Sequence, residues 1–473
     1  MAQYNQVTPE IVERLQAIAP GRVYTGADVN EDYSRDEMPI YGTRMPDVAI
    51  DAMSTEEISA IMKICNENHI PVTCRGAGTG LAGACTPIAG GVVICTMKMK
   101  KILSYDTDNF TVTVQPGVLL NDLAEDALKQ GLLYPPDPGE KFATLGGNVS
   151  TNAGGMRAVK YGATRDYVRS MTVVLPSGEV VKFGSSVSKT SSGYSLLNLM
   201  IGSEGTLGII TELTLKLIPA PKVTVSLIVP YESLPDAIAT VPQFKKAHMN
   251  PQALEFFERE ILISSEEYLG KAVFPRNVGG TDVGAYLLVT FDGETQEEID
   301  AIVEKAAELV LDAGALDVLV ADTPAKMKDA WAARSSFLEG IEEQTKLLDE
   351  CDVVVPPSRI ADFVGYVKSI EPEFGFAVKS FGHAGDGNLH IYTCANDMEL
   401  DEFKKQVDTF MTKIYDKATE MGGLVSGEHG IGMGKIEYLA RSVGETNMKL
   451  MEDIKKVFDP NLILNPGKVC YKL

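Results

Sequence analysis

Histidine, tryptophan and paired cysteines are scarce in this sequence of 473 residues. It contains five histidines and one tryptophan. The seven cysteines are odd in number and form no Cys-x-x-Cys pair, which argues against a disulfide framework and against a cysteine-ligated cluster. If the protein performs redox chemistry, we expect it to use another electron carrier.

Positive charge and long apolar runs are also lacking. The 43 basic residues face 65 acidic ones, and the net charge of −22 opposes binding to nucleic acid or to anionic membranes. No apolar run approaches the length of about 18 residues that a membrane helix needs, and no basic segment followed by an apolar core begins the chain. We therefore expect a cytoplasmic protein without membrane insertion, long enough for two or three domains.

Three of the five histidines fall between His383 and His429. The stretch from His383 to His390 reads His-Ala-Gly-Asp-Gly-Asn-Leu-His, and short apolar segments flank it, which predicts a β-hairpin. Together with Glu428, which stands among glycines, the two outer histidines suit a divalent Zn, Mn, Fe or Co ion with positions open for substrate. The alternative is two turn histidines and a surface Glu-His pair.

A glycine-rich segment, Arg-Gly-Ala-Gly-Thr-Gly-Leu-Ala-Gly at 75–83, follows a predicted strand at 72–74. Its glycines allow successive N–H groups to turn toward one pyrophosphate. Residues 78–83 also match the Rossmann fingerprint, which requires a helix directly afterwards. Because Pro87 and two glycines interrupt the following residues and 91–96 reads as a strand, we predict a phosphate-binding loop between strands. A Rossmann turn and a purely structural turn are the alternatives.

Further segments outline the rest of the architecture. Residues 144–155 are rich in glycine and small polar residues, which favours a loop whose backbone contacts a flat polar ring system, or else an ordinary irregular loop. From Val223 onward, strands alternate with helices, as in an antiparallel sheet covered by helices. Pro219-Ala-Pro221, just before this change of pattern, indicates a domain boundary.

Several motifs, taken in chain order, resemble one family. They are Arg75–Gly83, Pro136–Gly139, Thr144–Asn148, Gly202–Gly208, His383–His390, Gly427–Gly430 and Asn465–Gly467. With these motifs the chain is similar to the FAD-linked oxidases and dehydrogenases of the vanillyl-alcohol-oxidase (PCMH-type) fold, in the branch of D-lactate, glycolate and D-2-hydroxyglutarate dehydrogenases. The resemblance implies an α+β fold with a PCMH-type FAD-binding domain of two α+β subdomains at 1–220, a cap domain at 221–425 and a C-terminal segment at 426–473 that returns to the flavin domain.

The resemblance also implies which residues act. His383, His390 and Glu428 match the family's metal ligands, Asn388 lies near the substrate, and Arg334 clamps the substrate carboxylate, a role that suits the forked guanidinium group. The FAD contacts that it implies are Arg75, Gly76, Ala77, Gly78, Thr79, Gly80, Leu81, Pro138, Thr144, Gly147, Asn148, Ser150, Gly155, Glu204, Ile209 and Asn465.

One position departs from part of the family. Relatives that take dicarboxylic hydroxy acids place a basic residue where this chain aligns Glu350, which favours a short monocarboxylic substrate such as D-lactate over 2-hydroxyglutarate. The overall likeness is to lactate dehydrogenase catalytic subunits that work with an electron-transfer flavoprotein. We expect that flavoprotein as the acceptor before a quinone. Glycolate or D-2-hydroxyglutarate oxidation with a quinone or other acceptor is the alternative.

His429, next to Glu428, is the candidate general base. The unperturbed pKa of histidine lies near neutral pH, which suits removal of the hydroxyl proton while a hydride leaves for the flavin. Its alternative role is that of a fourth or outer metal ligand. Two other classes of protein compete with a dehydrogenase: a metallohydrolase without redox function, and a non-catalytic flavoprotein that only relays electrons.

Overall fold

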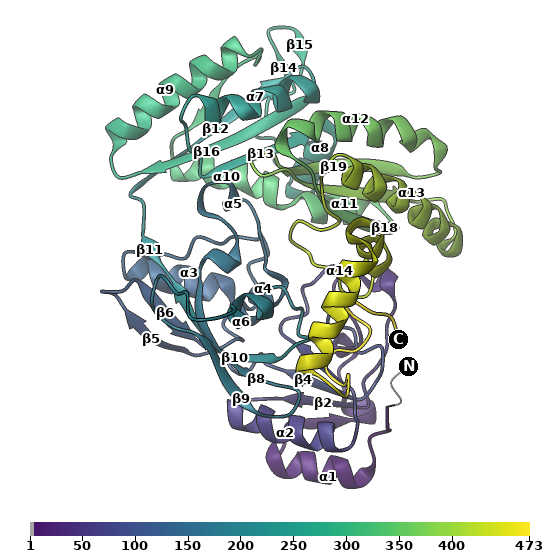
Figure 1. Ribbon diagram of the computed structural model, residues 1–473. Coiled ribbons are helices and arrows are strands. Elements are labelled where there is room, and N and C mark those ends of the chain that lie inside the picture. The colour runs from purple at the N-terminus through teal and green to yellow at the C-terminus, as the bar shows by residue number, and fades with distance from the viewer. Residues whose placement is uncertain (1–3) are drawn as a thin grey trace. The chain divides into compact units, whose positions relative to one another are not determined.

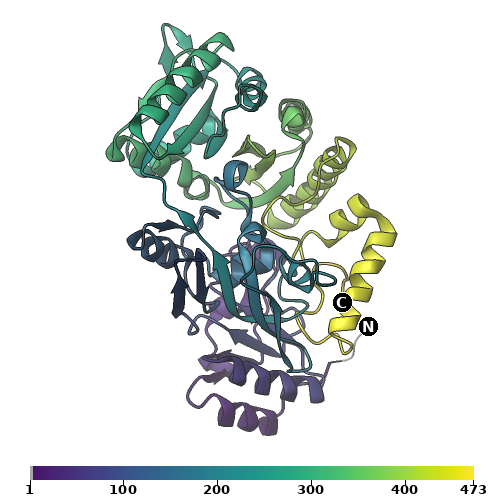
Figure 2. The ribbon, with the colours of Figure 1, turned by 60° about the vertical axis from the view of Figure 1, so that its left-hand side comes forward.

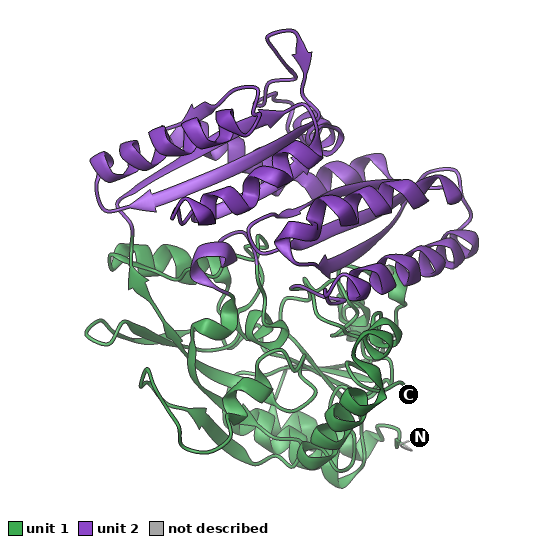
Figure 3. Ribbon diagram, turned by 45° about the horizontal axis from the view of Figure 1, so that its top comes forward, with its two compact units in different colours: residues 1–154, 163–220, 428–473 green, residues 155–162, 221–427 purple. Residues whose placement is uncertain are grey.

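The computed structural model describes residues 4–473 (Figures 1 and 2). It divides into two compact units, coloured separately in Figure 3: unit 1 comprises residues 1–154, 163–220 and 428–473, and unit 2 comprises 155–162 and 221–427. The divisions after residues 220 and 427 lie within two residues of the expected boundaries.

Residues 155–162, expected in the FAD domain, belong to unit 2. The physical reason is a buried carboxylate on β16 (Ala285–Gly293). Asp292 forms an ion pair with Lys160 and accepts hydrogen bonds from Tyr161, at 2.6 Å, and from Gln252, at 2.9 Å. These long-range contacts hold the short segment on unit 2, and sequence patterns do not reveal contacts of this kind.

Unit 1 contains a four-stranded sheet in the order β1-β2-β4-β3, in which β2, β4 and β3 are parallel. Helices α2 and α1 lie together on one side of it (Figures 1 and 2). Thr8 caps α1 and Ser54 caps α2. Each side chain accepts a hydrogen bond from a backbone N–H group in the first turn of its helix. The elements are β1 (Val23–Thr25), β2 (Val48–Asp51), β3 (Val72–Arg75), β4 (Val92–Cys95), α1 (Pro9–Ile18) and α2 (Thr55–Glu67).

The second sheet of unit 1 has five antiparallel strands in the order β5-β6-β10-β8-β9. The Asp106 side chain accepts from the N–H of Asn109 in the β5–β6 turn. Two sheets with flanking helices confirm the α+β class. The elements are β5 (Ile102–Asp106), β6 (Thr111–Val114), β8 (Val168–Val174), β9 (Val180–Gly184), β10 (Ile209–Lys216), α3 (Leu120–Lys129), and the small pair β7 (Leu132–Leu133) and β11 (Ile218–Pro219).

The two glycine-rich segments behave differently. Between β3 and β4 the described chain contains no helix, as predicted for a phosphate-binding loop and contrary to a Rossmann turn. The expectation of a loop at 144–155 is wrong for its first half, which forms helix α4 (Leu145–Thr151). Thr144 caps this helix by accepting from the N–H of Gly147, and Leu145 and Val149 are fully buried. Capping and burial therefore outweigh the low helix propensity of glycine.

Unit 2 is built on a seven-stranded sheet in the order β17-β12-β16-β13-β19-β20-β18, and every neighbouring pair is antiparallel. The predicted hairpin is confirmed as β19 and β20. The remaining strands are β12 (Val223–Tyr231), β13 (Ala253–Glu258), β17 (Leu319–Ala321) and β18 (Leu347–Val354), with β19 (Ala377–His383) and β20 (Asn388–Ala395).

Helices cover both faces of this sheet. An aromatic core packs the helices of one face against Phe257, Tyr286 and Phe381 of the strands. Phe291, which points the other way on β16, meets Phe244 of a helix on the opposite face. The first face carries α8 (Arg259–Leu269), α10 (Pro324–Ser335) and α11 (Phe337–Gln344), and the other helices are α7 (Leu234–Lys246), α9 (Gln296–Asp312), α12 (Ile360–Ile370) and α13 (Leu400–Glu420).

The C-terminal part of unit 1 begins with a long helix and ends beside the first sheet. Helix α14 (Ile436–Phe458) is interrupted at Gly444, whose φ is 79°. Beyond it, the backbone N–H of Asn465 bonds to the carbonyl of Val72 at 2.6 Å, next to the glycine-rich loop. Among residues 4–473, no helix combines the length and the apolar character that crossing a bilayer requires.

Candidate active site

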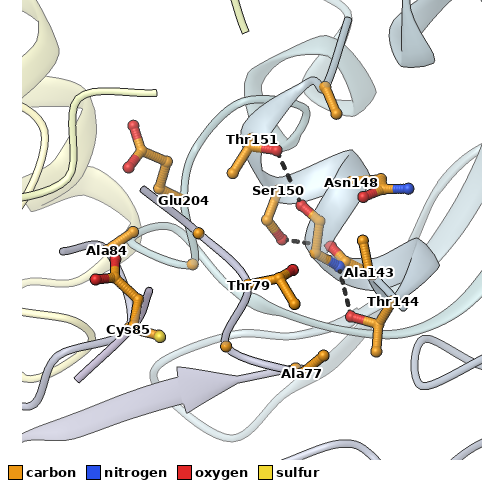
Figure 4. Close-up of a pocket in the computed structure, with 18 of the residues that line it drawn as sticks. Ala77, Thr79, Ala84, Cys85, Ala143, Thr144, Asn148, Ser150, Thr151 and Glu204 are labelled. Atoms are coloured by element: carbon orange, nitrogen blue, oxygen red, sulfur yellow. Dashed lines mark hydrogen bonds between the residues drawn. The ribbon is translucent and has the colours of Figure 1, made fainter. Parts of the chain in front are cut away.

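A cavity lies within unit 1, between the glycine-rich loop and α4 (Figure 4). Two further segments complete its wall, one around Glu204 and one at Glu428 and His429. Twelve of the predicted FAD contacts line it: Gly76, Ala77, Gly78, Thr79, Gly80, Leu81, Pro138, Thr144, Gly147, Asn148, Ser150 and Glu204.

Four predicted FAD contacts do not line this cavity. Ile209 points into the core, and its strand neighbour Ile210 faces the cavity instead, because successive side chains of a strand alternate. Gly155 belongs to unit 2. Arg75 lies behind the loop and donates to the carbonyl of Arg35 at 2.6 Å.

Asn465, the fourth, supports two parts of the wall. Its amide donates to the carbonyl of Ala84 at 2.9 Å and to that of Glu204 at 2.8 Å. The sequence had also not indicated several lining residues, because nothing in their local pattern marks them: Asp36, Cys74, Cys85, Thr96, Pro116, Glu140 and Thr151.

The glycines of the loop are required by close packing. A Cβ atom on Gly76 would lie 2.3 Å from Oγ1 of Thr144, and one on Gly78 would lie 1.9 Å from Nη2 of Arg75. Gly78 also has a φ of 85°, which disfavours any other residue. At these two positions the loop has no room for a side chain.

The cavity suits a large cofactor that carries a pyrophosphate. The glycine-rich loop on one wall suits the pyrophosphate, and α4 with its small polar side chains lines the cavity beside that loop. Asn148 adds a specific contact: its Nδ2 is buried and, among the described residues, has no hydrogen-bond partner, which a ring carbonyl or nitrogen would supply. The residues present fit FAD.

Glu204 ties the segment after His429 to the cavity wall. Its carboxylate accepts from the N–H of Ile431 at 2.8 Å and of Gly432 at 2.7 Å, and its backbone φ is 51°. Burial raises the pKa of Glu204, and the two N–H groups oppose that shift. The result is that Glu428 and His429, with Nε2 of the histidine 3.6 Å from Oε1 of the glutamate, line the same cavity as the glycine-rich loop.

Unit 2 places both predicted metal-ligating histidines on one face of its sheet. The rings of His383 and His390 lie 5.4 Å apart and are nearly perpendicular. Nδ1 of His383 bonds to Glu255 at 2.7 Å, and Nδ1 of His390 bonds to Glu350 at 3.2 Å. We call Glu255, Arg334, Glu350, His383 and His390 the histidine cluster; all five are buried.

Arg334 belongs to this cluster through a shared carboxylate. Its Nε and Nη2 donate to Oε2 of Glu255 at 2.9 and 2.6 Å, and its guanidinium lies over the rings of Phe381 and Phe337. Burial alone would raise the pKa of Glu255, but the charges of His383 and Arg334 hold that pKa below its usual range. Within the described chain Nη1 makes no hydrogen bond, and the substrate-clamp role remains a prediction.

Asn388 is anchored more tightly than the sequence suggested. Its amide nitrogen donates to Asp352 at 2.7 Å and to the carbonyl of Val353 at 3.1 Å. Asp352 also accepts from Ser426 and from the N–H of Gly427. Any contact of Asn388 with a substrate would therefore use its carbonyl oxygen, and this role stays a prediction.

The three predicted metal ligands are divided between the units. His383 and His390 belong to unit 2, whereas Glu428 begins the last part of unit 1, directly after Gly427 in the chain. The three-ligand set stays a prediction. Glu255 was missed as a partner of His383, although an acidic residue inside the apolar strand Ala-Leu-Glu-Phe-Phe-Glu is a signal that could have found it.

Comparison with known proteins defines the class. Residues 46–184 match the model of the "FAD binding domain" family, and residues 220–469 match that of "FAD linked oxidases, C-terminal domain". A solved structure of p-cresol methylhydroxylase with substrate bound superposes with a TM-score of 0.80 at 19% identity, covering 100% of this chain and 99% of that one. The fold is therefore the PCMH-type fold.

Curated relatives narrow the class further. The chain is 67% identical to D-lactate dehydrogenase of Anaerostipes hadrus, covering 100% of this chain and 99% of the relative. It is 37% identical to glycolate oxidase subunit GlcD of Bacillus subtilis, with 98% of both chains covered, and 31% identical to D-2-hydroxyglutarate dehydrogenase of Stutzerimonas stutzeri, with 98% and 99% covered. This chain belongs to the FAD-linked oxidase family, in the D-lactate, glycolate and D-2-hydroxyglutarate dehydrogenase branch, and FAD is its cofactor.

Proposed function

We propose that the protein is an FAD-dependent dehydrogenase that oxidises D-lactate, or a hydroxy acid of similar size, to the 2-oxo acid. The observation that carries the proposal is the 67% identity to a D-lactate dehydrogenase over the whole chain. Bound FAD supplies the acceptor for the hydride from C2 of the substrate. The cavity wall of unit 1 holds this cofactor through the backbone of the glycine-rich loop and through Asn148.

His429 is the proposed base that removes the hydroxyl proton. It lines the cavity that FAD fills, and a neutral imidazole near physiological pH accepts a proton readily. Arg334 is the proposed partner of the substrate carboxylate through its remaining nitrogen, Nη1. These two residues would orient the substrate and take its proton while C2 gives up its hydride.

We further propose a divalent metal ion at His383, His390 and Glu428. Histidines that bind metals usually donate their other ring nitrogen to a carboxylate, and Glu255 and Glu350 accept in that way here. Asp352 is buried on the same face of this sheet. Among the described residues of unit 2, Arg334 is the only buried lysine or arginine. These residues would hold a cation that offsets this negative charge and that would supply Lewis acidity to a substrate hydroxyl.

Glu350 supports a short substrate. A second carboxylate beside this buried acidic side chain would be repelled, so a dicarboxylic hydroxy acid should bind less well than D-lactate. For the electron acceptor we propose an electron-transfer flavoprotein, which is supported by the motifs shared with catalytic subunits that use one. Both points are open to direct measurement.

Anaerobic mixing with candidate substrates tests the reaction. We expect D-lactate to bleach the flavin absorbance faster than glycolate, D-2-hydroxyglutarate or L-lactate does. Reoxidation by an added electron-transfer flavoprotein should outpace that by a soluble quinone analogue. A flavin that stays oxidised with every hydroxy acid would refute the dehydrogenase, and faster bleaching by D-2-hydroxyglutarate would refute the assigned substrate size.

Elemental analysis tests the metal. His390→Ala should lose at least about tenfold in bound metal, because removal of a ligand leaves the site incomplete. His248→Ala, which changes an exposed histidine of the same unit, is the matched control and should keep the wild-type content. Equal metal contents in the two variants would refute the site.

A further inference from the structure

Glu255 contacts both a proposed metal ligand and the proposed substrate clamp. Its Oε1 lies 2.7 Å from Nδ1 of His383, and its Oε2 lies 2.9 Å from the same nitrogen. Oε2 also accepts from Nε and Nη2 of Arg334. One side chain therefore joins two groups that come from different elements, β19 and α10.

The surrounding structure leaves this carboxylate little freedom. Glu255 on β13 lies directly opposite His383 on β19 in the antiparallel ladder. Arg334 reaches the same face of the sheet and lies 4.7 Å over the ring of Phe381, two residues before His383 on that strand. Because Glu255 is fully buried, both contacts are strong and any movement of the carboxylate displaces both partners.

We propose that Glu255 is a positioning residue that couples metal binding to substrate binding. It fixes the ring of His383 and the guanidinium plane of Arg334 at once, so the metal site and the carboxylate clamp depend on one side chain. The proposal rests on the proposed function, because it takes His383 as a metal ligand and Arg334 as the clamp. By linkage, occupancy of one site then favours occupancy of the other.

Glu350 provides the matched comparison. It holds His390 through Nδ1 as Glu255 holds His383, but Arg334 makes no hydrogen bond to it in the described part of the chain. Glu258, on the opposite face of β13, bonds to Ser380 and Lys368 and touches neither histidine. Variants of the three glutamates therefore distinguish a loss of metal affinity from a loss of substrate binding. Glu258 controls for the loss of a carboxylate from strand β13.

The experiment compares Glu255→Gln, Glu350→Gln and Glu258→Gln as FAD-loaded full-length proteins. We expect the first two to lose about 10- to 100-fold in Zn²⁺ affinity, measured by competition with a chelator, as is typical when the outer partner of a metal ligand is removed. Glu258→Gln should retain wild-type affinity. Glutamine removes the negative charge and replaces one of the two acceptor oxygens by an NH₂ donor, so the hydrogen bonds to His383 and Arg334 are weakened together.

The decisive reading is the Michaelis constant for D-lactate at saturating metal. Glu350→Gln should raise KM less than Glu255→Gln does, because Arg334 keeps its hydrogen bonds to Glu255. Glu255→Gln should keep a KM at least about tenfold above that of Glu258→Gln, since charge-assisted hydrogen bonds to the clamp are lost, with kcat changed less than KM. Equal KM values for the two variants at saturating metal would overturn the coupling. So would a Zn²⁺ affinity of Glu255→Gln that matches Glu258→Gln.

Failure of the proposed function gives a different result, in the wild type itself: no bound metal, or a flavin that D-lactate does not reduce. If Glu255→Gln does not fold, Glu255→Asp takes its place. It keeps the negative charge opposite Arg334 but is one methylene shorter and cannot span both partners. The same comparison of KM and metal affinity with Glu350→Gln then supports or overturns the inference.

Discussion

The cavity of unit 1 and the histidine cluster of unit 2 differ in the chemical groups that form them. The cavity wall of unit 1 is rich in glycines and small side chains, its charged side chains are carboxylates, and no described lysine or arginine lines it. The histidine cluster of unit 2 is made of buried charged and ionisable side chains that hold one another in place. The cavity therefore offers a pyrophosphate backbone N–H groups without a lysine or arginine in its described wall.

This difference predicts which changes each region tolerates. The cavity should be sensitive to added atoms, because its loop packs against Thr144 and Arg75 with no room for a Cβ atom. The cluster should be sensitive to altered charge, because a buried carboxylate that loses its partner, or an arginine that loses its carboxylate, is costly.

The largest effect is expected from Gly78→Ala. Its Cβ would meet Nη2 of Arg75 at 1.9 Å, and Arg75 has little room to retreat because it is buried and bonded to Arg35. We expect purified Gly78→Ala to retain less than about a tenth of the wild-type FAD, since the strained loop no longer presents its N–H groups.

Gly21→Ala is the control for backbone strain alone. Gly21 has a similar φ of 73°, but a Cβ there meets nothing within 4 Å. It should lose about 1 kcal/mol of stability and keep its FAD. Flavin absorbance after gel filtration measures both variants. If both keep FAD equally, close packing of the loop is not what the cofactor site requires.

The next effect is expected from His429→Asn. Loss of a general base typically slows a reaction by about 10²- to 10⁴-fold, so flavin reduction by D-lactate should slow at least about a hundredfold while FAD and metal contents stay unchanged. Stopped-flow absorbance measures the rate, and His69→Asn, an exposed histidine of the same unit, is the control. Loss of metal would instead make His429 a metal ligand, and a wild-type rate would exclude it as the base.

The sequence predicted most of what depends on local pattern. The glycine-rich loop followed by a strand and the hairpin between His383 and His390 both appear in the structure. Each is decided within about ten residues, by periodicity and turn residues.

What the sequence could not show depends on partners far away in the chain. Helix α4 forms where a loop was expected, because Leu145 and Val149 find a core to pack in. Arg334 was assigned to a substrate, but its observed partner, Glu255, is 79 residues away. Pairings of this length follow from strand order, and local patterns do not encode strand order.

The smallest effect concerns Asp36, a carboxylate of the cavity wall that accepts N–H bonds from Met38 and Gly83. Burial raises its pKa to about 6. The folded protein therefore holds this proton more tightly than the unfolded chain, whose aspartates titrate near about 3.9. The stability that results is complete below about pH 4 and is lost as the pH rises through about 6.

Asp36→Asn lacks this proton equilibrium, so its unfolding free energy relative to wild type should rise between pH 4 and pH 7. A shift of about two pKa units corresponds to at most about 3 kcal/mol. Urea unfolding at several pH values measures the difference, and Asp312→Asn, at the exposed end of α9, should show no such trend. A difference that stays constant with pH would mean that Asp36 keeps its ordinary pKa in the fold. The cavity wall would then be polar enough to solvate a carboxylate. The cavity wall and the histidine cluster would then differ less in how well they stabilise a buried charge.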